Sequence, residues 1–129
     1  MIKSINNTLD ICNVISNDID FINAHGTATV YNDEMEARAF SNLNFNNTPV
    51  NSLKGYFGHT LGAAGVIETA ISLQSMRNNL LLKCKGFENQ DFDSKLDILT
   101  ENREIQVNTI LKTSSGFGGF NASAIIQKI

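Results

Sequence analysis

The residues of this chain best suited to catalysis are its two histidines, His25 and His59. His25 directly follows residues 19–24, and His59 lies in a glycine-rich turn after residues 50–53; both stretches are typical of short buried strands. Open α/β sheets build their sites at the carboxyl ends of strands, so both imidazoles have the same kind of position. A helix should begin near His59, and the positive end of its dipole disfavours imidazolium. The pattern favours a neutral histidine that donates a hydrogen bond, although one histidine in such a loop is more often structural.

Lys54 and Glu68 lie on either side of His59 in the same glycine-rich segment. Lys54 stands five residues before the histidine, where it could form an ion pair with Glu68 or raise the local electrostatic potential. The plainer alternative is an exposed lysine and a glutamate on a helix surface. Other residues mean little in isolation: Thr27 and Thr29 after the first histidine, Asp33 and Glu36 at a helix start, and Phe117 between glycines.

Apolar periodicity and turn residues predict alternating helices and strands. The helices are expected at 2–15, at about 33–43 after a cap at Asn32 or Asp33, and from Gly65 to about Arg77. The strands are expected at 19–24, 50–53, 80–82, 107–113 and 122–128, with an irregular connection over about 86–97. The last helix carries apolar residues at helical spacing and is expected to be largely buried; they are Val66, Ile67, Ala70, Ile71, Leu73 and Met76.

The composition fits one α/β domain over residues 1–129. The formal net charge is -3 without a basic cluster, which argues against nucleic acid as the main partner. Cys12 and Cys84 form no close-spaced pair, and the sequence has neither a secretory segment nor a run of about 18 apolar residues. We therefore expect a cytoplasmic protein that does not act at a membrane.

Three groups of residues, in this order along the chain, carry a specific resemblance. They are His25-Gly26-Thr27-Ala28-Thr29 with Asp33 and Glu36; Lys54 with Gly58-His59, Leu61 to Gly65 and Glu68; and Gly116-Phe117-Gly118-Gly119 with Asn121. Together they resemble the C-terminal half of a β-ketoacyl-[acyl-carrier-protein] synthase, over nearly the whole chain. The resemblance implies a thiolase-like α/β fold, a mixed sheet with flanking helices, and extension of acyl chains by decarboxylative Claisen condensation, in fatty acid or polyketide-like synthesis.

The resemblance also implies roles for the site residues. His25 and His59 would donate hydrogen bonds to the thioester oxygen, where negative charge develops during decarboxylation. Lys54 would belong to the catalytic set, with Glu68 in support. Thr27 and Thr29 match positions that bind the phosphopantetheine arm of acyl carrier protein, and Phe117 matches an aromatic gate. No cofactor beyond that arm and no metal is expected; the expected partners are acyl carrier protein and, in a full enzyme, a second copy.

One departure from the family pattern bears directly on activity. Condensation needs a cysteine thiolate that carries the acyl chain, and that cysteine belongs to the N-terminal half of the synthase, which is missing here. Neither Cys12 nor Cys84 resembles the family's nucleophile turn. We expect this chain alone to show neither condensation nor acylation of a cysteine. Smaller departures concern the shape of the pocket: Phe57 and Phe120 stand where threonine is common, and Ser115 where phenylalanine is common.

The resemblance further implies a gap in the sheet. The helix at 2–15 matches one that follows a central first strand, so the chain should begin after that strand. The strands at 19–24 and 107–113 would both have lain against it, leaving unpaired backbone groups. We expect closure of these strands onto each other, filling by another chain, or an empty slot, and association rather than a stable monomer.

Three functions remain open at this point. The first is a fragment or split product of a condensing enzyme, whose histidines should lie close together with Phe117 near them. The second is a non-catalytic partner subunit similar to chain-length factors, against which the retained histidines and Lys54 argue. The third is an unrelated hydrolase that binds a metal through both histidines and Glu68; it lacks the usual ligand spacing.

Overall fold

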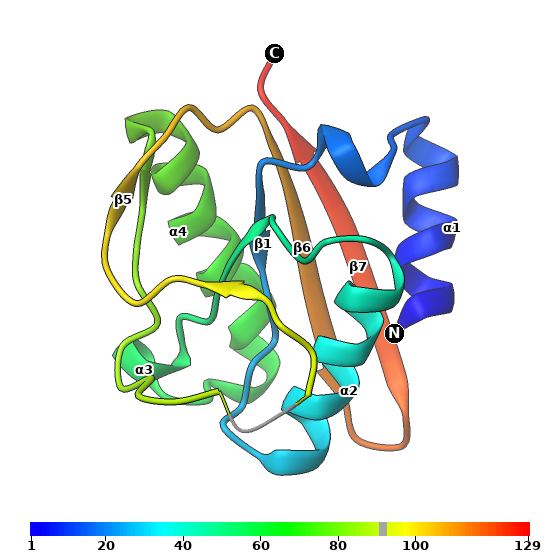
Figure 1. Cartoon of the computed structure of the whole chain (residues 1–129), viewed down its shortest axis with the longest axis vertical. Coiled ribbons are helices and arrows are strands. Elements are labelled where there is room, and N and C mark those ends of the chain that lie inside the picture. The colour runs from blue at the N-terminus through cyan, green and yellow to red at the C-terminus, as the bar shows by residue number, and fades with distance from the viewer. Residues whose placement is uncertain (91–92) are drawn as a thin grey trace.

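The computed structural model describes residues 1–90 and 93–129 as a layered α/β arrangement (Figure 1). The helices are α1 (Ile2–Cys12), α2 (Val30–Asn42), α3 (Lys54–Phe57) and α4 (Ala64–Asn78), with short 3-10 turns at Ser16–Asp18 and Leu61–Ala63. The strands are β1 (Phe21–Asn23), β2 (Pro49–Asn51), β3 (Leu80–Leu81), β4 (Asp97–Ile98), β5 (Arg103–Glu104), β6 (Thr109–Gly116) and β7 (Phe120–Gln127). The main sheet has the order β4-β2-β1-β6-β7, and β3 pairs with β5 in a separate ribbon.

The centre of the main sheet is β1, which lies between β2 and β6 and runs parallel to both. Ile22 is opposite Val50 on one side and Leu111 on the other. The strand order corrects the prediction of a missing central strand: β1 is itself the central strand, and α1 precedes it. The two strands that were expected to border the gap are β1 and β6, and they pair directly with each other. Such pairing was one of the three expected outcomes. The sheet therefore has no gap between these strands that would give the chain a reason to associate with another copy.

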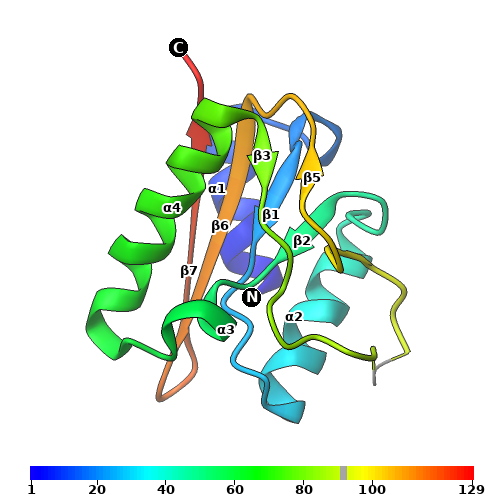
Figure 2. The ribbon, with the colours of Figure 1, turned by 90° about the vertical axis from the view of Figure 1, so that its left-hand side faces the viewer.

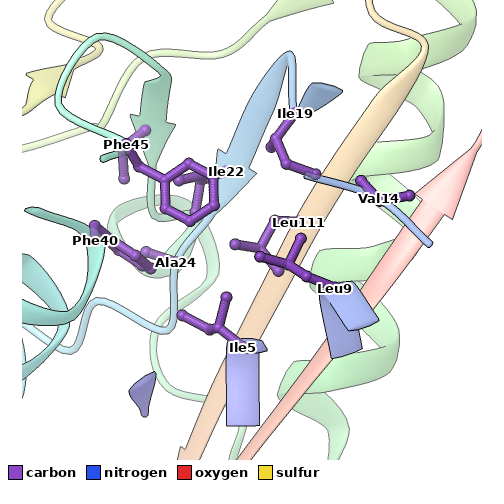
Figure 3. Packing of buried hydrophobic residues seen from close by; sticks show 10 residues of the cluster. Ile5, Leu9, Val14, Ile19, Ile22, Ala24, Phe40, Phe45 and Leu111 are labelled. Atoms are coloured by element: carbon purple, nitrogen blue, oxygen red, sulfur yellow. The ribbon is translucent and has the colours of Figure 1, made fainter. Parts of the chain in front are cut away.

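The sheet separates two cores, because neighbouring residues of β1 point to opposite faces. On one face α1 and α2 cover Ile22 and Leu111, and the same cluster contains Phe40 of α2 and Phe45 from the loop after it (Figure 3). On the other face Phe21 packs in a second cluster that includes Met76 of α4. Figures 1 and 2 show α4 across the sheet from α1 and α2. The sheet is thus covered on both faces and fixed beneath the edge that carries the histidines.

Several element predictions are confirmed and others are wrong in detail. The helix expected from 33 begins at Val30, after Thr29 and without a side-chain cap. The turn α3 and the short strands β4 and β5 were not predicted. The irregular connection expected over 86–97 ends in β4, and its residues 91 and 92 lie outside the described part of the chain. Short strands and one-turn helices carry too few residues to show a period.

The prediction of a largely buried α4 is wrong. Of its six apolar residues named above only Met76 is buried, and Val66 is 75% exposed. Besides Met76, the buried face of α4 carries small and polar residues: Ala64, Glu68, Ser72 and Ser75. No helix among the described residues has the length and apolar character to cross a membrane.

Candidate active site

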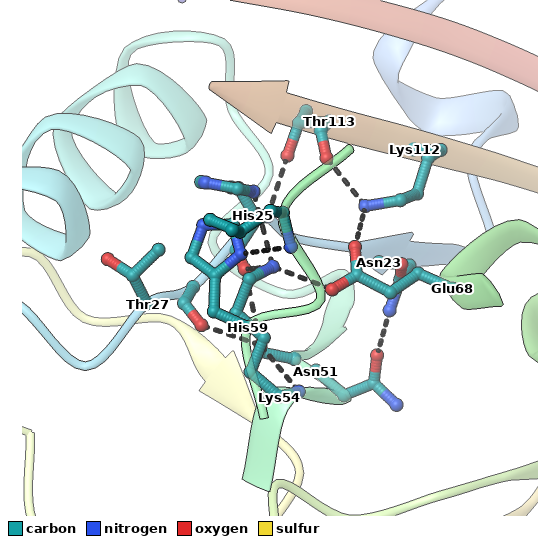
Figure 4. Close-up of polar contacts among 12 residues, drawn as sticks. Asn23, His25, Thr27, Asn51, Lys54, His59, Glu68, Lys112 and Thr113 are labelled. Atoms are coloured by element: carbon teal, nitrogen blue, oxygen red, sulfur yellow. Dashed lines mark hydrogen bonds and ion pairs between the residues drawn. The ribbon is translucent and has the colours of Figure 1, made fainter. Parts of the chain in front are cut away.

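The carboxyl ends of β1 and β2 lie side by side because the two strands are parallel. Ala24 donates its backbone N–H to the carbonyl of Asn51 at 2.8 Å, which extends the pairing to the residue before His25. The ring centroids of His25 and His59 are 5.2 Å apart with an interplanar angle of 82°. The prediction that the two histidines come together at the strand ends is confirmed (Figure 4).

A buried carboxylate fixes the loop that carries His25. Glu36 of α2 accepts the backbone N–H of His25 at 3.0 Å and that of Gly26 at 2.7 Å. Its Oε1 also accepts the hydroxyl of Thr113 from β6 at 2.7 Å, and its Oε2 accepts the amide of Asn32 at 3.1 Å. Glu36 is only 2% exposed. One side chain therefore ties the loop after β1 to a helix on one face and to the neighbouring strand.

Gly26 and Ser52 hold the same loop against the end of β2. Ser52 donates its hydroxyl to the carbonyl of Gly26 at 2.7 Å. Gly26 has a φ of +44°, and a Cβ at this position would lie 2.5 Å from the Cβ of Ser52. Only glycine allows both this backbone angle and this close approach.

Lys54 opens α3 and points into the protein rather than into solvent. Its side chain is 8% exposed, and Nζ lies 2.6 Å from Oε1 of Glu68. Nζ also donates to the carbonyl of His25 at 2.5 Å and lies 3.2 Å from Nδ1 of the same residue. The alternative of an exposed lysine and a surface glutamate is therefore wrong. Because an ammonium group has only donors, Nδ1 of His25 must accept, and the neutral ring carries its proton on Nε2.

His59 receives its orientation from a different source. The backbone N–H of Leu61 donates to Nδ1 of His59 at 3.1 Å, which again leaves the proton of a neutral ring on Nε2. Gly58 has φ 74° and ψ -178°, and Leu61 has a φ of 51°. His59 itself is exposed, whereas His25 is 4% exposed. Both rings are thus set to donate from Nε2, one from a buried position and one from an open turn.

Lys112 was missed by the sequence analysis. It lies in β6, is 5% exposed, and its Nζ is 2.7 Å from Oε2 of Glu68. It also donates to the carbonyl of Thr113 at 2.6 Å. The signal was available, because a lysine inside a stretch that reads as a buried strand needs a partner. The sequence analysis noted Glu36 as part of a motif but did not predict that it binds the backbone of the His25 loop.

Burial and nearby charges together keep His25 neutral. Burial lowers the pKa of His25 below its ordinary value of 6.5, and the ammonium group of Lys54 lowers it further. Glu36 and Glu68 act in the opposite direction, and His59 adds a smaller lowering effect. The pKa of Lys112 is also lowered by burial, against the raising effect of Glu68. A neutral His25 with its proton on Nε2 can donate one hydrogen bond to a developing anion.

The expected substrate-binding residues lie at the open side of this edge. Thr27 and Thr29 share a hydrogen bond between their hydroxyls at 2.7 Å. The backbone N–H of Thr27 donates to Asp33 at 3.1 Å. Phe117 lies in the turn between β6 and β7 and is 95% exposed. Its proximity to the histidines stays a prediction, as do the binding roles of the two threonines.

Neither cysteine is placed like a nucleophile of this site. Cys12 is exposed at the end of α1. Cys84 accepts the backbone N–H of Ser52 through Sγ at 3.1 Å, and burial raises its pKa, which disfavours the thiolate. Within residues 1–90 and 93–129, no group of three or more His, Cys, Asp or Glu side chains is arranged to hold a metal ion.

Comparisons with known proteins bear on the family and the fold of this chain. The family profile described as "Beta-ketoacyl synthase, C-terminal domain" matches residues 1–88. The 3-oxoacyl-[acyl-carrier-protein] synthase 2 of Coxiella burnetii is 36% identical over 127 residues, which are 95% of this chain and 31% of that protein. The chain thus spans about a third of the length of its curated relatives.

The solved structures with a similar fold include the following two. The ishigamide ketosynthase/chain length factor superposes with a TM-score of 0.94 at 28% identity, covering 99% of this chain and 32% of that one. A type II polyketide acyl carrier protein in complex with its ketosynthase bound to the hexaketide gives a TM-score of 0.93 at 26% identity, again over 99% of this chain and 32% of the other.

Proposed function

Because the chain belongs to the β-ketoacyl synthase family through that family's C-terminal domain, we propose that it supplies the histidine pair of a condensing enzyme. The reaction would extend an acyl chain on acyl carrier protein with a malonyl unit. The observation that carries this proposal is the pair of adjacent imidazoles, His25 and His59, in each of which a donor contacts Nδ1.

The proposed chemistry follows from where charge develops. When the malonyl thioester loses carbon dioxide, the electron pair of the broken C–C bond moves into an enolate whose oxygen becomes negative. Nε2–H groups of His25 and His59 would stabilise that oxygen, and preorganised donors are most effective at this point of a reaction. The enolate carbon then attacks the carbonyl carbon of the acyl thioester. The bond between that carbon and the sulfur of the nucleophilic cysteine breaks, and the cysteine leaves as a thiolate. Neither histidine has to exchange a proton in the decarboxylation.

Lys54 supports the pair without taking part in bond changes. Its Nζ contacts both the carbonyl and Nδ1 of His25, and Glu68 holds it there. This arrangement selects the tautomer that donates from Nε2 and opposes protonation of the ring. A neutral donor is preferable to an imidazolium here because it does not stabilise the malonyl carboxylate before it leaves.

The remaining parts of the reaction require surfaces outside this chain. The thiolate would come from the N-terminal half of a synthase, which would cover apolar side chains that this chain leaves exposed; they are Phe57, Leu61, Val66 and Phe117. Thr27 and Thr29 would bind the phosphopantetheine arm of acyl carrier protein, and Phe117 would act as a gate. A homodimer is proposed for the full enzyme.

The test is decarboxylation and condensation with malonyl-carrier protein, measured with and without a cysteine-bearing N-terminal half supplied as a second chain. Condensation is expected only in the mixture. His25→Ala and His59→Ala should each reduce decarboxylation about 100-fold, as for loss of one oxyanion donor, whereas Asn46→Ala, on the distant loop before β2, should not. Equal rates in the histidine variants, or stoichiometric acylation of Cys12 or Cys84, would contradict the proposal.

A non-catalytic, chain-length-factor-like role is the alternative. It requires no working histidine pair, and the contacts of His25, His59 and Lys54 give no support to it. In the same assay it predicts that both histidine variants behave as the parent chain.

A further inference from the structure

Glu68 lies between two buried ammonium groups. Oε1 is 2.6 Å from Nζ of Lys54, and Oε2 is 2.7 Å from Nζ of Lys112 (Figure 4). All three side chains are less than a tenth exposed. One carboxylate needs only one cation for neutrality, and a buried lysine is costly. Lys54 already meets that need, so pairing with Glu68 alone does not account for Lys112.

The charges around His25 explain the second lysine. The groups that face this ring, directly or through Glu68, come from five parts of the chain: Lys54 from α3, Glu36 from α2, Glu68 from α4, His59 from the turn before α4, and Lys112 from β6. With His59 neutral, the two lysines and the two glutamates cancel. Burial then decides the state of His25 and favours the neutral ring.

Removal of Lys112 would break this balance. Glu36, Glu68 and Lys54 would leave one net negative charge beside a buried imidazole, and a nearby negative charge favours imidazolium. Nζ of Lys112 forms an ion pair with Glu68 and donates a hydrogen bond to the carbonyl of Thr113; both contacts favour the ammonium form, against the lowering effect of burial on its pKa. Lys112 does not contact His25, so its positive charge acts on the ring through space, next to that of Glu68.

We propose that Lys112 is a positioning residue whose positive charge balances that of Glu68 and so keeps His25 in the neutral form, with its proton on Nε2. The benefit of a neutral His25 rests on the proposed function, because that benefit lies in the decarboxylation step. The charge balance itself does not depend on substrate. Its test can therefore be made on the free chain, and it can fail while the proposed function stands, or the reverse.

The test is an NMR titration of His25, through its ring Cε1 signal, in the parent chain and in five variants. Lys112→Met should move the titration of His25 to higher pH, and Glu68→Gln should move it to lower pH. The double variant restores the balance and should titrate close to the parent chain. Lys112→Arg keeps the charge and should do the same. Lys128→Met, which removes an exposed lysine, is the control for a general change in net charge.

The outcomes separate an electrostatic role from a structural one. If Lys112→Met fails to fold, as its amide spectrum would reveal, the comparison of Glu68→Gln with the double variant still isolates the effect of Lys112. A higher titration in the double variant than in Glu68→Gln supports the proposal. Equal titration of these two, or a parent chain in which His25 titrates above its ordinary value, would overturn it.

Discussion

The loops that carry His25 and His59 build one site by different means. The His25 loop is buried and held by Glu36, Ser52 and Lys54, each of which binds at least one of its backbone groups. The His59 turn is exposed. The ring of His59 accepts a hydrogen bond from the backbone N–H of Leu61, in the same turn. The position of the His25 donor is thus fixed by contacts with several elements, whereas that of the His59 donor depends on the local geometry of a short turn.

The largest expected effect comes from replacing the glycine of each loop by alanine. Gly26→Ala should lower the free energy of unfolding by about 3 kcal/mol or more, through an unfavourable φ and overlap with Ser52. Gly58 also has a positive φ, of 74°, but a Cβ there would meet nothing within 4 Å. Gly58→Ala should cost only about 1 to 3 kcal/mol from the backbone. Urea unfolding of both variants checks the order; an equal or reversed order would break the comparison.

The next effect tests the carboxylate that anchors the His25 loop. Glu36→Gln places an amide nitrogen against backbone donors and should cost about 2 kcal/mol or more, because a buried donor loses its acceptor. The matched control is Glu34→Gln, two residues earlier on the same helix, where the partly exposed side chain pairs with Arg38. That change should stay within about 0.5 kcal/mol. Similar losses in denaturant unfolding would show that Glu36 is not the anchor.

The smallest effect is the dependence of stability on pH. The pKa of His25 is lower in the folded chain than its ordinary 6.5, so the unfolded chain binds the proton more readily. The stability contribution of the neutral ring is complete above pH 6.5 and is lost as the pH falls through the lower folded pKa. The free energy of unfolding should therefore decline with acidification in this window. His25→Gln should remove that part of the decline; an unchanged profile would argue against the burial of a neutral ring.

The motifs allowed both histidines, Lys54 and Glu68 to be predicted, because each lies within a local sequence pattern tied to a strand end. The Lys112 contact could not be found in this way. It joins β6 to α4 on one face of the sheet, and a strand pattern indicates burial but not which group of another element lies opposite. The exposed side of α4 was missed for a related reason. Periodicity identifies an apolar face, but it does not say whether this chain covers that face.

The mistaken gap in the sheet has a topological cause. The helix at 2–15 was matched with one that follows a central strand, and the sequence does not state which strands are neighbours. Direct pairing of Phe21 with Ile110 and of Ile22 with Leu111 decides the order. Nearest neighbours in a parallel sheet are separated by long crossovers, so their register is not written in any short segment.

The most direct test of the account is the tautomer of each histidine in the free chain. Long-range proton–nitrogen correlation spectra of nitrogen-15-labelled protein, recorded near neutral pH, report which ring nitrogen carries the proton. We expect Nε2–H on both His25 and His59, with Nδ1 accepting from Lys54 and from the backbone N–H of Leu61. A proton on Nδ1 in either ring, or a charged His25, would contradict a site built to donate two hydrogen bonds to one oxygen.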